Sequence, residues 1–169
     1  MEKIFEPLLT LFQNRILWTS VIAWLVAQTV KMIIASVVQH RLQITRLFGD
    51  GGMPSSHSSF VAAMSVMCGW CCGVDSPLFA VATIIAFIVM HDAMGVRRET
   101  GKQAVTIREL ADAFNAQFSE KDLSIRTEKL KVLVGHTPNQ ILIGALFGCF
   151  IAALSLLLFP IEYASLRMF

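Results

Sequence analysis

The chain has 169 residues, enough for one domain, and 55% of them are hydrophobic. Only 15% are charged, whereas a soluble domain carries about a quarter, and the mean hydropathy is +0.63. This composition excludes an ordinary soluble protein and indicates an integral membrane protein, whereas the net charge of +2 excludes no class of partner by itself.

Four apolar runs are candidate membrane segments, and we expect all of them to be helical. The first has about the 20 residues that a span needs, whereas the second and third are short and are either tilted spans or a re-entrant hairpin. The runs cover residues 16–38, 58–74, 78–94 and 141–159. The sequence therefore predicts an all-α integral membrane helical bundle with about four membrane segments, in a single membrane domain of residues 1–169.

The polar stretch of residues 95–137 is predicted to be a helical loop outside the membrane. Apolar residues at helical spacing predict an amphipathic helix over residues 106–118, and a capping pattern precedes a second candidate helix over residues 123–133. With four crossings, this loop and residues 39–57 lie on one side of the membrane. The same holds if the second and third runs form a hairpin that does not cross.

Basic residues are distributed unevenly between the two sides of the predicted bundle. Ten lie on the side of the polar loops and three lie on the other side. The ten are Arg41, Arg46, Arg97, Arg98, Lys102, Arg108, Lys121, Arg126, Lys129 and Lys131, and the three are Lys3, Arg15 and Arg167. Because basic residues concentrate in cytoplasmic loops, we expect a multi-pass protein of the cell membrane whose polar loops face the cytoplasm.

Two histidines stand where a polar loop ends and an apolar run begins. They are His57 in Pro-Ser-Ser-His and His136 in Gly-His-Thr-Pro. A helix N-terminus presents backbone N–H groups and the positive end of the helix dipole, so it suits an anion. A neutral histidine can attack phosphorus without a metal, and a protonated one can donate to the leaving group. With Arg97 and Arg98 on the same side, these residues indicate a site that cleaves phosphate esters at the membrane surface.

Four motifs resemble the divergent branch of the type-2 phosphatidic acid phosphatase family, which is related to the vanadium haloperoxidases. They are Gly-Gly-Met-Pro-Ser-Ser-His-Ser at 51–58, Asp-Ala-Met-Gly-Val-Arg-Arg at 92–98, Gly-Lys-Gln-Ala at 101–104 and Gly-His-Thr-Pro at 135–138. The resemblance covers about residues 20–160. It implies that His136 is the nucleophile and that His57 is the general acid. It also implies that Ser55 and Ser56 bind phosphate.

The chain departs from the family pattern around its second histidine. The family has an arginine six residues before this histidine, where the chain has Leu130, and an aspartate four residues after it, where the chain has Gln140. A neutral amide can orient an imidazole but does not stabilise its cation as a carboxylate does. Asp92 is a candidate for that catalytic role from another helix, or else the structural partner of an arginine. Thr137 and Gln140 also form a capping-box pattern, which needs no function.

Further phosphate-binding side chains are predicted outside the histidine motifs. The family's first motif, a lysine followed by Arg-Pro, is not recognisable, and Arg97, Arg98 and Lys102 are candidates to replace it. Neighbours on a helix diverge by about 100°, so we expect only one of the two arginines to point into a site. Lys31 is the only charge in the first apolar run, and charges within membranes are often functional, so it is a further candidate to bind phosphate or to support the site.

We interpret the protein as a membrane lipid phosphatase that works through a phosphohistidine and uses no metal and no cofactor. Candidate substrates are phosphatidic acid, phosphatidylglycerophosphate and polyprenyl phosphates or diphosphates, and no nucleic acid is expected as a partner. Gly144-x-x-x-Gly148 permits close packing within one chain or in a homodimer. Two alternatives are a non-catalytic protein that binds anionic lipid headgroups or a protein partner, and a haloperoxidase-like enzyme with bound vanadate.

Overall fold

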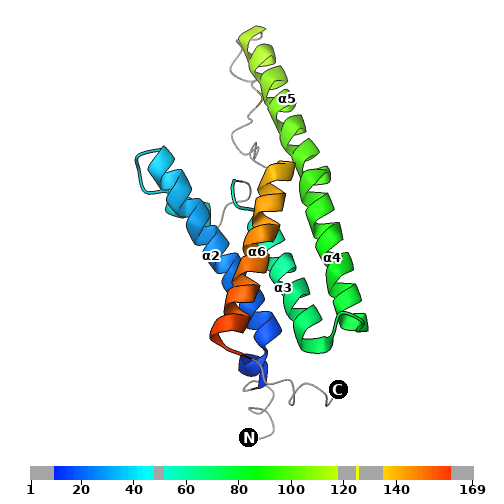
Figure 1. Cartoon of the computed structure of the whole chain (residues 1–169). Coiled ribbons are helices and arrows are strands. Elements are labelled where there is room, and N and C mark those ends of the chain that lie inside the picture. Colours follow the sequence, from blue (N-terminus) through cyan, green and yellow to red (C-terminus); the bar gives the residue numbers. More distant parts are fainter. Residues whose placement is uncertain (1–9, 48–51, 118–124, 126–134, 161–169) are drawn as a thin grey trace, which may run out of the picture.

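The computed structural model describes residues 10–47, 52–117, 125 and 135–160, and every regular element in these ranges is a helix. In chain order they are α2 (Arg15–Val38), the 3-10 helix η1 (Ile44–Leu47), α3 (Ser56–Cys72), α4 (Pro77–Met94), α5 (Val96–Gln117) and α6 (Pro138–Leu158). Helices α2, α3, α4 and α6 alternate in direction, and α5 continues α4 beyond the end of the bundle (Figure 1). The fold is the predicted all-α membrane bundle.

Each of the four bundle helices begins at a side-chain N-cap that the sequence supplies. Asn14, Ser55, Ser76 and Thr137 each accept a hydrogen bond from the backbone N–H three residues further on. In α4 and α6 a proline follows the cap, at the first helical position, where its missing N–H leaves no bond unmade. Gln140 completes the cap of α6 by accepting from the backbone N–H of Thr137, which confirms the predicted capping box.

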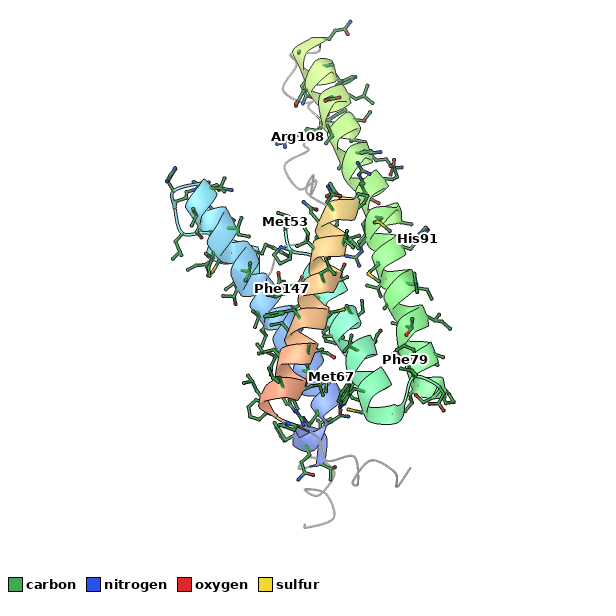
Figure 2. The ribbon with its side chains drawn as sticks, viewed as in Figure 1. Met53, Met67, Phe79, His91, Arg108 and Phe147 are labelled. Carbon is green, nitrogen blue, oxygen red and sulfur yellow. The ribbon has the colours of Figure 1, made fainter. Side chains whose placement is uncertain are left out.

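Helix α3 lies at the centre of the bundle, since it packs against α2, α4 and α6. The core cluster consists of Ala23 on α2, Ala63 and Met67 on α3, and Ala152 on α6. Met67 is the largest fully buried side chain among the described residues (Figure 2). Small residues at such interfaces let helix backbones approach closely, which is how membrane helices gain packing contacts in the absence of a hydrophobic driving force.

Two glycines bring α6 directly against α3. A Cβ atom at Gly144 would overlap the backbone oxygen of Ser55, and one at Gly148 would overlap the backbone oxygen of Ser59. The Gly-x-x-x-Gly motif is therefore used within one chain. It does not supply the surface for the homodimer that the sequence offered as an alternative.

The outer surface of the bundle is apolar. Ile84 and Phe87 on α4 and Leu146 and Phe150 on α6 are 58–69% exposed, as expected of side chains that face lipid. Three helical stretches are long and apolar enough to cross a membrane, namely Arg15–Val38, Pro77–Gln117 and Pro138–Leu158. Helix α3 has 17 residues and a length of about 26 Å, close to the ~30 Å hydrocarbon core.

Helix α5 begins at Val96, ten residues before the predicted helix of residues 106–118. The bend at Gly95 does not end the helical path, and the residues that follow include strong helix formers such as arginine, glutamate and lysine. The helix predicted over residues 106–118 is present as the second half of α5, and the prediction missed only its start, because it searched for an apolar face, which the first turns of α5 lack. Arg97, Arg98 and Lys102 consequently lie on a helix.

The last turns of α5 make two hydrogen bonds to Ile125. The side chain of Asn115 donates to the backbone oxygen of Ile125 at 3.0 Å and accepts from its N–H at 2.8 Å. Apart from Ile125, the second predicted helix over residues 123–133 lies outside the described residues. The two bonds join positions that are ten residues apart in the sequence.

Candidate functional site

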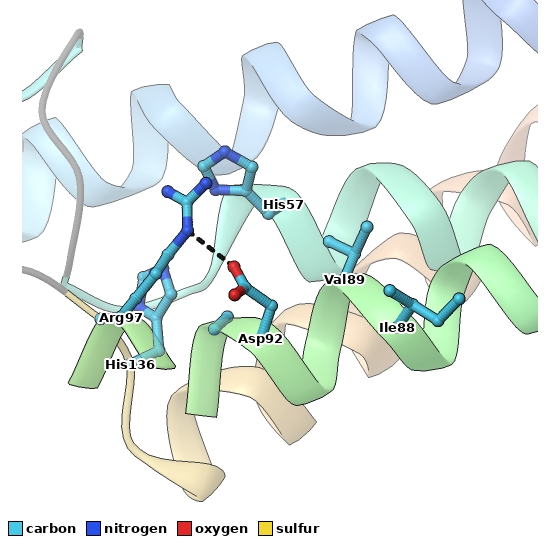
Figure 3. A pocket seen from close by; sticks show the side chains of 8 residues that line it. His57, Ile88, Val89, Asp92, Arg97 and His136 are labelled. Carbon is cyan, nitrogen blue, oxygen red and sulfur yellow. Dashed lines mark hydrogen bonds and ion pairs between the residues drawn. The ribbon is translucent and has the colours of Figure 1, made fainter. Parts of the chain in front are cut away.

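A cavity of about 280 Å³ opens where α3 begins, α4 ends and the chain enters α6. Its polar lining residues are His57, Asp92, Arg97 and His136, and its other lining residues are Ile88, Val89, Ala93 and Gly135. Figure 3 shows the four polar side chains converging on this space from α3, α4, α5 and the loop before α6. The pocket thus brings together the three residues predicted to be catalytic and one of the two arginines.

His57 is the second residue of α3 and is half-buried. The preceding turn is built by Ser55, whose hydroxyl oxygen accepts from the N–H of Ser58 at 3.4 Å and from its hydroxyl at 3.0 Å. The N–H of Ser55 donates to the backbone oxygen of Gln140 at 3.2 Å, which joins the start of α3 to the first turn of α6. His57 therefore lies at the positive end of the α3 dipole, where an anion is favoured.

His136 is held more tightly and is only 4% exposed. Its backbone N–H donates to the oxygen of Ala93 at the end of α4, at 3.0 Å. The preceding Gly135 has a φ of 90°, and a Cβ atom there would overlap the backbone of Arg98 at the start of α5. The loop can therefore lie directly on the α4–α5 junction only with glycine at this position.

The imidazole of His136 has an amide as its neighbour. Its Nδ1 lies 3.3 Å from Oε1 of Gln140, one turn further along the chain. Asp92, which the sequence offered as a partner for this ring, lines the same pocket. Gln140, at the position where the family has an aspartate, is the residue whose side chain lies beside Nδ1.

Asp92 pairs with an arginine, as in the structural alternative considered for it. Nε of Arg97 donates to Oδ2 of Asp92 at 2.9 Å, and both side chains are a little under half exposed. An exposed pair of this kind adds at most about 1 kcal/mol to stability. Its consequence is geometric, because it bridges the bend at Gly95 and keeps the guanidinium in the pocket.

The predicted phosphate-binding residues Ser55, Ser56 and Lys31 lie behind the pocket and do not line it. Both serines are fully buried. Lys31 is 4% exposed, and its Nζ lies 3.4 Å from Oγ of Ser56, while its aliphatic chain packs beside Gly52. Lys31 thereby connects α2 to Gly52 and Ser56 at the start of α3. Its positive charge also reinforces the dipole at the start of α3.

Two further candidates lie outside the pocket. The side chains of Arg98 and Lys102 are exposed on α5 and do not line the cavity. Nζ of Lys102 pairs with Oε1 of Glu99 at 2.6 Å, a contact between neighbouring turns. Only Arg97 of the adjacent arginines points into the site, in line with the angle between neighbours on a helix.

The apolar wall of the pocket was missed in the sequence. Ile88 and Val89 come from α4, and they lie on the cavity side together with Asp92. A signal was present, because residues four and three positions before Asp92 share its helix face. This face of α4 therefore gives the pocket one carboxylate and an apolar wall of Ile88, Val89 and Ala93.

The described residues contain no group of three or more His, Cys, Asp or Glu side chains placed to hold a metal ion. Cys68 is buried in α3, and all four cysteines are free. The functional groups that the pocket presents are two imidazoles, a guanidinium and a carboxylate, beside the N-terminal ends of two helices.

Comparisons with known proteins agree with the motifs. Residues 12–151 match the model of a family described as the divergent PAP2 family. The chain is also similar to the uncharacterized membrane protein YuiD of Bacillus subtilis (strain 168), with 42% identity over 144 residues, covering 82% of this chain and 91% of that protein. No solved structure matches the chain.

Proposed function

Because the chain belongs to the divergent PAP2 family, we propose that it is a membrane phosphatase that removes phosphate from a lipid phosphate. One observation carries this proposal, namely that His57, His136 and Arg97 line one pocket whose remaining wall is apolar. Two imidazoles and a guanidinium match the needs of phosphoryl transfer, and the apolar wall matches the tail of a lipid.

The proposed reaction has two steps. A ring nitrogen of neutral His136 attacks phosphorus, the bond from phosphorus to the lipid oxygen breaks, and protonated His57 gives its proton to that oxygen. Water then attacks the phosphohistidine, neutral His57 takes a proton from it, and the nitrogen–phosphorus bond breaks to release phosphate. The two histidines return to their starting protonation states, so the cycle is balanced without a metal or a cofactor.

Charge stabilisation in this mechanism comes from two sources. Arg97, held by Asp92 through its Nε, directs its terminal nitrogens at the phosphate oxygens. The starts of α3 and α6 add the positive ends of their dipoles. Lys31 supports the α3 start through Ser56 rather than by touching phosphate. Asp92 has a positioning role in this scheme.

The lipid is proposed to enter sideways from the membrane. Ile88 lines the cavity and is also 62% exposed on the outer face of α4. An apolar chain can therefore lie along α4 while the phosphate reaches the histidines. The excess of basic residues at this end of the bundle supports a cytoplasmic position for the site. Phosphatidic acid, phosphatidylglycerophosphate and polyprenyl phosphates or diphosphates are the candidate substrates.

The decisive experiment measures phosphate release from these lipids by the purified protein in detergent, with EDTA present. Release should continue in EDTA, vanish in His136→Ala and fall by about 10²–10⁴-fold in His57→Ala. His91→Ala is the matched control, because His91 is exposed on the last turn of α4 and does not line the pocket. An active His136→Ala variant contradicts the mechanism, and a folded protein that binds lipid phosphate without turnover supports the non-catalytic alternative.

A further inference from the structure

The side chain of Gln140 makes two contacts through one atom. Its Oε1 accepts from the backbone N–H of Thr137 at 3.0 Å, and the same oxygen lies 3.3 Å from Nδ1 of His136. Gln140 is half-buried and does not line the cavity. It is therefore placed to act on the imidazole and not on a ligand.

Thr137 identifies which end of the amide faces the imidazole. A backbone N–H can only donate, so the atom that it contacts must be the amide oxygen and not the amide nitrogen. A flipped amide would set two donors against each other. The capping box thus determines the orientation of the Gln140 amide independently of the histidine, which removes the usual ambiguity of amide assignment.

The orientation of the amide determines the position of the proton on His136. Because Oε1 carries no hydrogen, this contact is a hydrogen bond only in the tautomer in which Nδ1 is the donor. In the neutral ring the lone pair is then on Nε2. At 4% exposure, little water competes with Gln140 for Nδ1.

We propose that Gln140 is a positioning residue that keeps the His136 proton on Nδ1 and thereby makes Nε2 the nitrogen that receives the phosphoryl group. The second half of this inference rests on the proposed function. The backbone contacts of Gly135 and His136 determine where the ring lies, whereas Gln140 determines which nitrogen carries the lone pair.

The proton on Nδ1 stays in place through the whole cycle. Nε2 gives its lone pair to phosphorus, the bond to the lipid oxygen breaks, and that oxygen takes the proton of His57. In the intermediate, phosphorus is on Nε2 and hydrogen is on Nδ1, bonded to Oε1 of Gln140. Water then attacks phosphorus and passes a proton to His57, and the bond from Nε2 to phosphorus breaks. The ring returns with its lone pair on Nε2.

Because Gln140 is uncharged, the charges near His136 come from other groups in the pocket. Among the described residues, the titratable or charged groups that share the pocket with His136 are His57 from α3, Asp92 from α4 and Arg97 from α5. A carboxylate in place of the amide favours the imidazolium and so raises the pKa of His136. Because the nucleophile must be neutral, the acidic limb of kcat/KM moves to higher pH in Gln140→Glu.

The first test measures the tautomer by ¹⁵N NMR of the full-length protein without substrate, with His136→Ala used to identify the signal. Wild type should show hydrogen on Nδ1, and Gln140→Met, which keeps the bulk but lacks the acceptor, should shift the ring toward hydrogen on Nε2. Thr137→Ala is the matched control, because it removes the hydroxyl cap but keeps the backbone N–H and Oε1. Hydrogen on Nε2 in wild type, or an unchanged tautomer in Gln140→Met, overturns the inference.

The second test identifies the phosphohistidine isomer after an alkaline quench. Wild type and Thr137→Ala should trap phosphate on Nε2 alone, whereas Gln140→Met should trap at least about tenfold less and yield some of the Nδ1 isomer. Equal losses in Gln140→Met and Thr137→Ala indicate a merely structural residue and overturn the inference. If the tautomer responds to Gln140 but no lipid phosphate is cleaved, the proposed function fails by itself. If cleavage needs His136 but neither readout responds to Gln140, only this inference fails.

Discussion

Helices α3 and α6 begin side by side, and each begins next to a histidine that lines the pocket. Both have a hydroxyl N-cap, Ser55 or Thr137. His57 follows its cap and belongs to the helix, whereas His136 precedes its cap and belongs to the loop. The two starts are alike in sequence and differ in how they hold the histidine.

The difference lies in the number of constraints on each ring. The loop of His136 is held by a backbone bond to Ala93 and by close contact of Gly135 with α5, and its ring is oriented by Gln140. His57 has its backbone in the first turn of α3, and its side chain is half-buried. A group that forms a bond to phosphorus needs close alignment, whereas a proton donor needs only hydrogen-bond reach. The constraints therefore match the proposed roles.

The largest expected effect separates the two histidines by leaving group. With a lipid phosphate, both His57→Ala and His136→Ala should lose nearly all activity. With an aryl phosphate whose oxygen leaves without a proton, His57→Ala should form the phosphohistidine and release a first equivalent of the phenol within about tenfold of the wild-type rate, whereas His136→Ala should release none. Hydrolysis of the phosphohistidine should stay slow in His57→Ala, because His57 is also the base of that step, so the measurement is the initial burst of alcohol or phenol from the two esters. Equal recovery in both variants would refute the assignment of roles.

The next effect tests the loop that holds His136. Gly135→Ala places a Cβ atom into the backbone of Arg98 at a positive φ, so the ring should move and activity should fall by about 100-fold. Gly73→Ala is the matched control, because Gly73 also has a positive φ but lies at the other end of α3. Both should lower the melting temperature, and only Gly135→Ala should inactivate the folded protein. Equal activities would show that loop placement is unimportant.

A smaller effect is expected from Arg97, the arginine that lines the pocket together with the two histidines. Arg97→Gln removes a charged donor that lines the cavity and should raise KM and lower kcat/KM by about 10–100-fold. Arg98→Gln removes the same charge from the next residue, which is exposed and outside the pocket. It should change kcat/KM by less than about threefold. Steady-state kinetics on one lipid checks both variants, and equal losses would mean that net charge matters and not position.

The bundle was predictable because its signals are local. Apolar runs, prolines and hydroxyl caps define where α4 and α6 begin. The structure places both helix starts within three residues of the predicted starts of the runs. The start of α5 was missed because its early turns have no apolar face, although their helix propensity is high. In these early turns of α5, helix propensity indicated the helix and hydrophobic periodicity did not.

The site was only partly predictable, because its parts meet through tertiary contacts. His57 and His136 could be placed on one side of the membrane from the parity of crossings. The sequence offered an arginine as the partner of Asp92, but it did not indicate that this arginine is Arg97 across a bend or that Lys31 reaches Ser56 from α2. These contacts depend on distances between helices, which spacing along the chain does not specify.

The smallest effect compares the two caps themselves. Ser55→Ala and Thr137→Ala each remove one cap and should each cost about 1 kcal/mol of stability, measured as similar shifts in thermal unfolding.

The activities of these two variants should differ. His57 is positioned by the first turn of α3, so Ser55→Ala should lower kcat about fivefold, equivalent to about 1 kcal/mol. His136 keeps its bond to Ala93 and its contact with Gln140 without the Thr137 hydroxyl, so Thr137→Ala should stay within about twofold of wild type. Equal losses of kcat would show that both histidines depend on their caps and that the additional contacts of His136 do not position it.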